Sequence, residues 1–156
     1  MKKIILIVII LLNVNEKIIA NEIYGLPVIT DGDTIKISNN KIRLHGIDAP
    51  EKDQKCYKNK KKYNCGTVAT EALFKKINKN AIKCLIQKNK DRYNRFLGVC
   101  FVGQENLNKW MVRKGYAVAY IRYSKDYILD EEFAKKNKLG LWAGTFLKPE
   151  KWRKVN

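Results

Sequence analysis

Two neighbouring segments of this chain alternate between apolar and polar residues. They span residues 34–38 (TIKIS) and 41–47 (KIRLHGI), and in each the isoleucine and leucine side chains face one way. A period of two residues is typical of a strand with one buried face. Asn39 and Asn40 lie between the segments and predict a tight two-residue turn. The chain therefore builds an antiparallel hairpin early in its core.

The remaining patterns predict an ordered series of strands and helices. Residues 52–63 hold six lysines without an apolar period, which predicts a loop. Strands that do not alternate with helices argue against a parallel βαβ sheet. Five strands with a helix between the third and fourth follow the order of an OB-fold Greek-key barrel. The sequence predicts a mainly β, α+β fold with a five-stranded barrel and about three helices. The other predicted elements are strands at 22–29, 81–87 and 95–102, an extended segment at 117–123, and helices at 67–77, 106–115 and 128–140.

The first twenty residues read as a secretory signal peptide. A basic start (MKK) precedes an apolar run of nine residues at 4–12, and Ala20 is a small residue suited to cleavage. The run is too short for a membrane span of about 20 residues. We expect a secreted or periplasmic domain at 21–156 without stable membrane insertion after cleavage; an uncleaved N-terminal tether is the alternative.

The chain is strongly basic. Its formal charge is +17, and residues 21–156 alone keep 29 basic and 14 acidic residues, or about +15. Such a charge favours a polyanionic partner, which could be nucleic acid, anionic lipid or anionic sugar. Nothing in the sequence indicates an oligomer, and we expect a monomer.

Four cysteines lie in the part expected to be exported, at positions 56, 65, 84 and 100. An even count in a small exported domain is typical of disulfides. Zinc is disfavoured because no C-x-x-C spacing occurs and His45 is the only histidine. Three pairings are possible. We expect Cys56–Cys65, which would close the lysine-rich loop, and Cys84–Cys100, which would join neighbouring strands.

Carboxylates gather where the predicted hairpin strands end. Pairing through the turn places Asp33 level with residues 45–48, so Asp33, Asp48 and Glu51 should meet at one mouth of the barrel. Hard oxygen ligands suit Ca²⁺ better than zinc. Asp31 is less clearly aimed at this point. Local pairing of these acids with lysines is the plainer alternative.

Two arginines favour a catalytic role for these carboxylates over local pairing with lysines. Arg43 and Arg95 offer planar, permanently charged forks that match phosphate oxygens. A metal ion and two arginines can stabilise the extra charge of a phosphodiester transition state. Strand alternation places Arg43 opposite Ile42 and Leu44, so it would need a bulge near Gly46 or a reach over the rim.

Four segments carry a resemblance to the staphylococcal nuclease (thermonuclease) family. The likeness runs in order from about Ile23 to Trp142, and the four cysteines and the tail resemble an exported bacterial branch of that family. Two residues depart from the family pattern: Asn94 stands where glycine is usual, and Arg122 stands where a second tyrosine is expected. The segments are VITDGDT (28–34), IRLHGIDAPE (42–51), DRYNRFLGV (91–99) and KKNKLGLW (135–142).

The resemblance implies a Ca²⁺-dependent phosphodiesterase that cuts DNA and RNA to 3′-phosphate and 5′-hydroxyl ends. It implies that Asp33, Asp48 and the carbonyl of Ala49 are calcium ligands. It further implies that Glu51 holds or deprotonates the attacking water. In the same comparison Arg43 and Arg95 grip the phosphate.

Other residues complete the expected substrate site. Tyr120 matches a family tyrosine near the terminal phosphate, and Lys52 and Tyr93 are further candidates for contacts with single-stranded or locally melted DNA and RNA. The lysines of 52–63 would track phosphates without reading sequence; a solvated loop is the alternative. His45 is expected to be structural, or to line the phosphate site, rather than to act as a general base. Trp110, Trp142 and Trp152 are expected in core and tail packing. A non-catalytic nucleic-acid-binding module and a cationic protein that binds lipid or polysaccharide remain as rival functions.

Overall fold

A bent first strand closes the sheet into a barrel. The computed structural model describes residues 21–156, so the predictions for residues 1–20 lie outside the described residues. Two halves of the first strand pair with opposite edges of the sheet, β1 with β8 and β2 with β3, and the circle continues through β4 and β9. The barrel strands are β1 (Asn21–Gly25), β2 (Pro27–Ile29), β3 (Thr34–Ile37), β4 (Asn40–Leu44), β8 (Ile82–Lys90) and β9 (Phe96–Val102).

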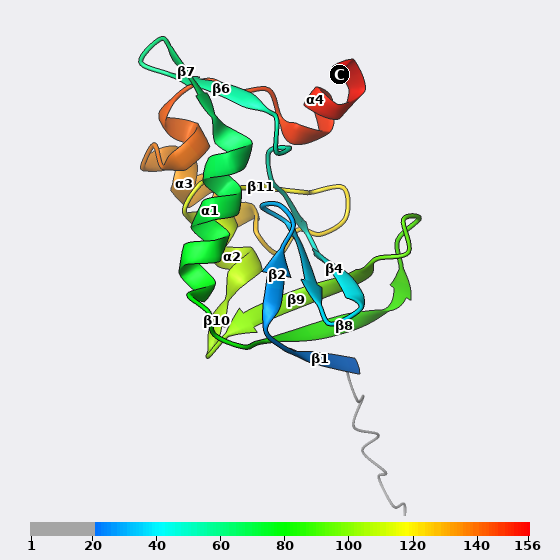
Figure 1. Ribbon diagram of the computed structural model, residues 1–156. Helices are drawn as coiled ribbons and strands as arrows, with labels where there is room; N and C mark the ends of the chain where they lie inside the picture. The colour runs from blue at the N-terminus through cyan, green and yellow to red at the C-terminus, as the bar shows by residue number, and fades with distance from the viewer. Residues whose placement is uncertain (1–20) are drawn as a thin grey trace, which may run out of the picture.

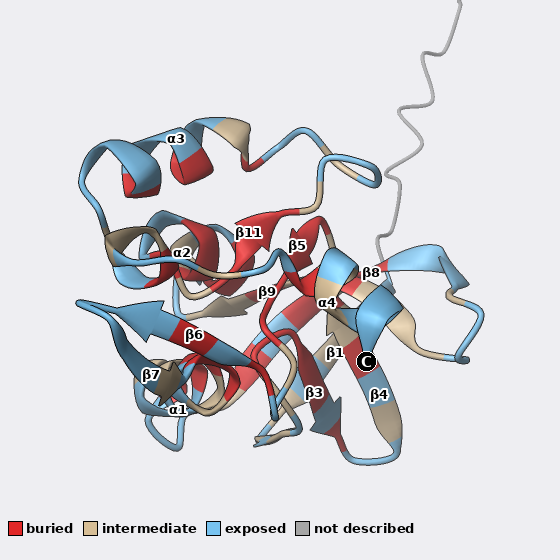
Figure 2. Cartoon of the chain, turned by 90° about the horizontal axis from the view of Figure 1, so that it is seen from above, coloured by how far each residue is buried: buried red, intermediate tan, exposed pale blue. Residues whose placement is uncertain are grey.

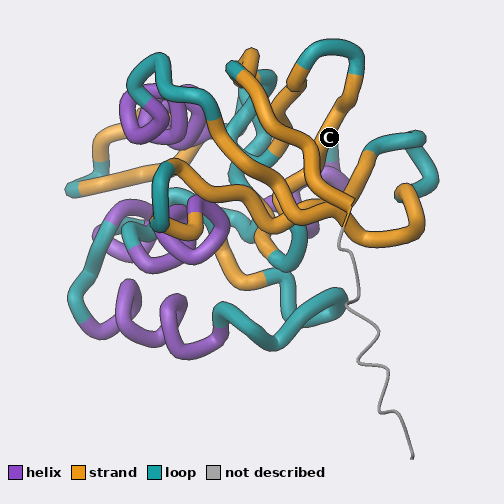
Figure 3. Tube along the Cα trace, turned by 90° about the horizontal axis from the view of Figure 1, so that it is seen from below, coloured by secondary structure: helices purple, strands orange, loops and turns teal. Residues whose placement is uncertain are grey.

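The first three α-helices lie to one side of the barrel, as Figures 1 and 3 show, whereas the C-terminal helix lies apart from them in Figure 1. β4 and β9 run parallel, whereas the other barrel pairs are antiparallel. The four α-helices of the described chain are α1 (Cys65–Ile77), α2 (Leu107–Arg113), α3 (Ile128–Lys136) and α4 (Pro149–Val155), with a 3-10 turn at Gly140–Ala143. The short strands are β5 (Ile47–Asp48), β6 (Lys55–Lys58), β7 (Lys61–Asn64), β10 (Glu105–Asn106) and β11 (Val118–Ala119). Across residues 21–156, no helix is both long and apolar enough to cross a membrane.

The barrel core is built from the alternating residues of the early hairpin. Ile35, Ile37, Ile42 and Leu44 are each at most 2% exposed, while Lys36 between them faces solvent. Burying one such side chain contributes about 1.5–3 kcal/mol. Figure 2 shows the consequence: β3, β5 and β11 are largely buried, whereas α3 and the β6–β7 hairpin present exposed outer faces. The predicted α+β barrel is confirmed.

The early hairpin turns one residue sooner than predicted. Ile37 pairs with Asn40, so Ser38 and Asn39 form the turn, and Ser38 adopts a left-handed φ of 51°. As a result Asp33 lies level with Leu44, whose backbone N–H donates to the Asp33 carbonyl at 2.8 Å, rather than with residues 45–48.

The lysine-rich segment is a hairpin, so the predicted loop at 52–63 is wrong. β6 and β7 pair antiparallel, and Asn59 and Lys60 form the turn with φ values of 50° and 63°. The pattern hid the strands because both faces are mostly exposed; only Cys56 is buried. Backbone bonds of 2.9 Å in both directions tie Tyr57 to Thr145 and hold the hairpin against the C-terminal segment.

The predicted helix count and helix ends also need correction. Residues 21–156 form four α-helices rather than about three, because residues 149–155 fold into α4, which begins with Pro149. α3 ends at Lys136, and Gly140 instead begins the 3-10 turn. Of the extended segment predicted at 117–123, only β11 pairs as a strand.

Both expected disulfides are confirmed. Cys84 and Cys100 lie opposite each other on β8 and β9, with a Cα–Cα distance of 4.0 Å. Cys56 and Cys65 are 5.6 Å apart by the same measure and join the hairpin to the start of α1. Trp142 packs edge-on against Phe146 in a second apolar cluster beside this disulfide.

Candidate active site

The acidic residues lie just before the start of β3 and at the end of β5. The loop before β3 carries Asp33, which is 4% exposed, and β5 ends with Asp48, which is 1% exposed. The Ala49 backbone N–H donates to Asp33 Oδ2 at 2.9 Å and fixes the two loops against each other. Asp48 is held from the other side by the pairing of β5 with β11, opposite Val118. Two carboxylates are thus fixed at one end of the barrel.

Arg43 bridges these two carboxylates. Its Nη1 donates to Asp33 Oδ1, and its Nη2 donates to Asp48 Oδ1 at 2.9 Å. Alternation does place Arg43 off the core face, but the β3–β4 register is continuous, and the side chain reaches Asp33 and Asp48 from the strand end without a bulge. Burial opposes the charge of Arg43, yet the two carboxylates outweigh it and raise the pKa of the guanidinium.

A third arginine, which the sequence did not indicate, joins Asp48 to Glu51. Arg153 of α4 donates from Nη1 to Asp48 Oδ1 at 2.9 Å and to Glu51 Oε1 at 2.7 Å, and from Nη2 to Asp48 Oδ2 at 3.1 Å. It lies 102 residues after Glu51 in the chain. An arginine in a basic tail carries no pattern that could have shown this contact.

The carboxylates therefore meet through arginines and not directly. Within residues 21–156, no three Asp, Glu, His or Cys side chains are arranged as a metal-binding group. Two guanidinium groups nevertheless link three carboxylates, and a fourth, that of Asp31, joins them by accepting from the Asp33 backbone N–H at 3.0 Å. Burial and then the charge of Asp33 raise the pKa of Asp31 to about 6. Burial likewise raises the pKa of Asp48, against the hydrogen bonds from Arg153.

This excess of carboxylates over arginines, with Asp33 and Asp48 buried, fits a hard divalent cation. The donors are all oxygens, which calcium prefers, and an added positive charge would offset the two causes that raise the pKa of Asp31, which are burial and then the charge of Asp33. Asp33 and Asp48, with the carbonyl of Ala49, are the groups that could hold it. The arrangement suits calcium better than zinc, because no cysteine thiolate or imidazole takes part.

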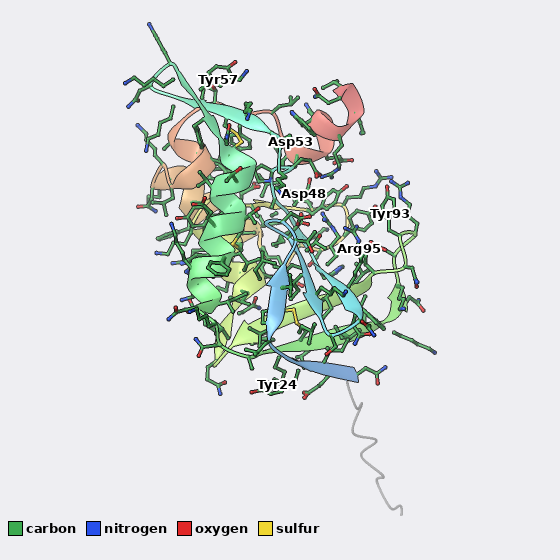
Figure 4. All side chains as sticks on the ribbon, viewed as in Figure 1. Tyr24, Asp48, Asp53, Tyr57, Tyr93 and Arg95 are labelled. Carbon is green, nitrogen blue, oxygen red and sulfur yellow. A yellow bond between two sulfur atoms is a disulfide. The ribbon has the colours of Figure 1, made fainter. Side chains whose placement is uncertain are left out.

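Arg95 approaches the same end of the barrel from the turn between β8 and β9. Asp91 holds it: Arg95 Nε donates to Asp91 Oδ2 at 2.8 Å, and its backbone N–H donates to Asp91 Oδ1 at 2.9 Å. Nη1 also reaches Thr34 Oγ1, beside Asp33, at 3.4 Å. Asn94 takes a left-handed φ of 61°, so the turn tolerates asparagine in place of glycine, as expected. In Figure 4, Asp48, Arg95 and Tyr93 lie on the same side of the molecule.

The backbone of Glu51 is clamped between α1 and the C-terminal segment. A Cβ on Gly66, near the start of α1, would lie 1.8 Å from the Glu51 carbonyl oxygen, so only glycine permits this approach. Gln54 is fully buried, accepts from the Glu51 N–H at 3.2 Å and donates to the Leu147 carbonyl at 2.6 Å. Sequence reasoning missed Gln54, since a buried glutamine within a lysine-rich segment has no distinguishing pattern.

The predicted substrate residues surround this end of the barrel. Tyr93 is 62% exposed, and the Arg95 guanidinium lies 5.2 Å from its ring centre. Burial and then the charge of Asp48 raise the pKa of Tyr120, which meets Tyr123 edge-on at 4.7 Å. Lys52 follows Glu51 directly and is exposed. Exposed Tyr123 offers a ring one place after Arg122.

The backbone of His45 is tied into the barrel, and two of the tryptophans are accounted for by packing. The His45 backbone N–H donates to the Gly98 carbonyl at 2.8 Å, and its own carbonyl accepts from buried Asn108 at 2.9 Å. Burial lowers the pKa of the imidazole. Trp110 packs against the barrel core and Trp142 against the second apolar cluster, as expected. Trp152 lies half-buried on α4.

Comparison with known protein families agrees with this geometry. The model of the family described as staphylococcal nuclease homologue matches residues 41–144. The chain belongs to the staphylococcal nuclease family. The match includes Arg43, Asp48, Glu51 and Arg95, whereas Asp33 and Arg153 lie outside it.

Three relatives illustrate the range of this nuclease family. An uncharacterized endonuclease of Haemophilus influenzae is 37% identical over 134 residues, covering 81% of this chain and 70% of the relative. A micrococcal nuclease of Shigella flexneri is 33% identical over 147 residues, covering 82% and 78%. The succinoglycan biosynthesis protein ExoI of Rhizobium meliloti is 32% identical over 126 residues, covering 79% and 66%.

Proposed function

We propose that this chain is a calcium-dependent nuclease that hydrolyses phosphodiester bonds of DNA and RNA and leaves 3′-phosphate and 5′-hydroxyl ends. The observation that carries the proposal is the joined group of Asp33, Arg43, Asp48 and Glu51 at one end of the barrel. Family membership and the relatives named as nucleases support it. Carboxylates that only balanced exposed lysines would lie at the surface, whereas Asp33 and Asp48 are buried and bonded to Arg43.

Each residue has a role that follows from its chemistry. Asp33, Asp48 and the Ala49 carbonyl would hold Ca²⁺, which when bound supplies a Lewis acid beside the phosphate. Glu51 would orient the attacking water and accept its proton. Arg43 and Arg95 would each donate to phosphate oxygens and stabilise the charge that develops as the water attacks.

The direct test compares cleavage with and without calcium. Single-stranded DNA and RNA, each labelled at one end, are incubated with the oxidised protein in Ca²⁺ or in excess chelator. We expect cleavage only in Ca²⁺, with a 3′-phosphate on the upstream fragment and a 5′-hydroxyl on the downstream fragment of every cut. Binding without cleavage at all calcium concentrations would contradict the proposal and favour the non-catalytic binding module. Binding to anionic vesicles alone would favour the cationic surface-binding protein.

The β6–β7 hairpin would form a track for the substrate, that is, a row of exposed lysines that contacts its phosphates beyond the one that reacts. Its lysines are exposed, it begins four residues after Glu51, and the Cys56–Cys65 disulfide fastens it to α1. Tyr57 is 47% exposed and could stack on an unpaired base. Lysine contacts to phosphate hold a strand without reading its sequence.

This track predicts a defined salt dependence. Replacing Lys58, Lys61 and Lys62 by glutamine should weaken single-stranded DNA binding and lower the slope of log K against log salt. The slope should fall by about 0.7 for each lysine–phosphate ion pair that the substitutions remove from a single strand. Affinity is measured in chelator, so that no substrate is cleaved, from about 50 to 300 mM salt.

The matched control removes three lysines elsewhere. Lys75 lies in the last turn of α1, Lys79 in the turn after it and Lys83 on β8; Figure 1 shows this end of α1 and β8 away from the hairpin. Their replacement by glutamine makes the same change in net charge and should leave most of the slope intact. Equal slopes for the two triple variants would exclude the hairpin as a track.

We also propose that the protein works outside the cytoplasm, as a monomer. Two disulfides are typical of proteins in oxidising compartments. The signal peptide expected at residues 1–20 is consistent with export to the periplasm or the medium. N-terminal sequencing of the exported protein and its mass in solution test both statements.

A further inference from the structure

Arg153 uses the oxygen atoms that a cation would need. Its two terminal nitrogens donate to both carboxylate oxygens of Asp48, at 2.9 and 3.1 Å, and one also donates to Glu51 at 2.7 Å. Arg43 shares Asp48 Oδ1 at 2.9 Å. The lone pairs that accept these N–H groups are the ones that would coordinate a metal. Arg153 and a metal ion at Asp48 are therefore competitors for the same acceptors.

We propose that Arg153 is a tethered cation that competes with calcium for Asp48 and Glu51 and so sets the calcium affinity of this site. The inference rests on the proposed function, in which Asp48 is a ligand and Glu51 holds the water. Calcium binding releases Arg153 and, with it, α4. While α4 is docked, Glu51 is engaged by Arg153 and is not free to orient water.

α4 is built to leave its docked position at low cost. It has seven residues, and a helix this short is marginal without tertiary contacts. Val155 is 70% exposed, and the ion pair between Arg122 and Glu150, at 3.5 Å, joins side chains that are 68% and 34% exposed. Such an exposed pair contributes little. The contacts of Arg153, whose side chain is 33% exposed, are the main polar link between α4 and the site.

The segment before α4 keeps the released helix nearby. Buried Gln54 donates to the Leu147 carbonyl at 2.6 Å, and paired backbone bonds join Tyr57 and Thr145 at 2.9 Å. Pro149 is buried at the start of α4. With this anchor a few residues away, Arg153 stays at high effective concentration and returns when calcium leaves.

Arg153 is a feature of this chain's tail. The family match ends at residue 144, before α4 begins. With competition of this kind, the apparent calcium affinity equals the intrinsic affinity multiplied by the fraction of molecules in which Arg153 is withdrawn. Because coupling is reciprocal, calcium must weaken the docking of α4 by the same factor. The inference therefore predicts an effect on affinity and an effect on the helix.

Isothermal titration of Ca²⁺ into the oxidised protein measures the first effect. Arg153→Gln removes the competing charge and should bind calcium about 5- to 20-fold more tightly than the wild type, within the usual range of such couplings. Lys151→Gln is the matched control, because it removes one positive charge from an exposed position of the same helix. It should change the affinity less than about twofold, since an exposed charge is screened.

Amide hydrogen exchange at residues 149–155 measures the second effect. In the wild type, calcium should speed exchange in α4. In Arg153→Gln, exchange should be fast with and without calcium. Lys151→Gln should behave like the wild type.

The outcomes separate this inference from the proposed function. Calcium-dependent cleavage with equal affinity in wild type and Arg153→Gln would overturn the inference alone. Weaker binding by Arg153→Gln would also overturn it, since Arg153 would then orient Asp48 for the metal. If neither protein binds calcium, the proposed function and the inference both fail. Tighter binding together with fast exchange in α4 establishes the competition.

Discussion

Replacing Glu51 or Arg95 by glutamine is expected to lower the rate of DNA cleavage about 10²- to 10⁴-fold. A positioned general base contributes roughly that factor, and the loss of one group that stabilises transition-state charge costs about 10²–10³. Glutamine keeps the size of Glu51 but cannot accept a proton from water. Initial rates on single-stranded DNA in saturating Ca²⁺ measure the loss.

Two further variants test whether the rate loss expected for Arg95→Gln comes from a lost contact with the reacting phosphate. Arg92→Gln removes an arginine from the same turn, where it lies 4.8 Å from the Tyr93 ring, and should retain activity within a few-fold. Arg95→Lys keeps the charge but not the planar fork, and should recover only part of the rate. The melting temperature of each variant shows whether the turn that Asp91 holds by hydrogen bonds remains folded. Wild-type rates for Glu51→Gln or Arg95→Gln would exclude those residues from the chemistry.

Removal of the Cys84–Cys100 disulfide is expected to lower the free energy of unfolding by about 3 kcal/mol. Closing a loop of this length, 16 residues apart in sequence, restricts the unfolded chain by about that amount. Both cysteines are fully buried between β8 and β9, so Cys84→Ala with Cys100→Ala also weakens the packing of the core. Denaturant unfolding measures the change, and the melting temperature should fall by on the order of 10 °C.

The other disulfide is the internal comparison. Cys56 and Cys65 are nine residues apart and lie in the smaller apolar cluster beside the hairpin. Their replacement by alanine should cost less stability, because these side chains pack outside the barrel core. A loss below about 1 kcal/mol for the Cys84–Cys100 variant would mean that the barrel does not depend on this link.

The barrel could be predicted because its signals are local. Ile35, Ile37, Ile42 and Leu44 alternate at a period of two, and this alone fixes which face of the hairpin is buried. The position of the turn does not follow from the same pattern. Asn39 and Asn40 have the composition of a turn pair, but the turn uses Ser38 and Asn39, because the register is decided by which isoleucines reach the core.

The β6–β7 hairpin escaped prediction because its strands face solvent on both sides. Its pairing depends on the left-handed turn at Asn59 and Lys60, on the Cys56–Cys65 bond and on backbone bonds to Thr145. None of these leaves an apolar period in the sequence. The exposure of the lysines follows from their composition, but their arrangement on a fixed hairpin needed the fold.

The sequence by itself determined the barrel, the pairing of the cysteines that its strands bring together, and the identity of the charged residues from Asp33 to Arg95. Only the tertiary structure decided how those charges meet. Arg43 reaches Asp33 and Asp48 from the strand end, and Arg153 reaches Asp48 and Glu51 from a helix about a hundred residues away. Periodicity reports which face of an element is buried, whereas an ion pair between distant segments depends on where the chain returns, and one arginine in a basic tail gives no local sign of it.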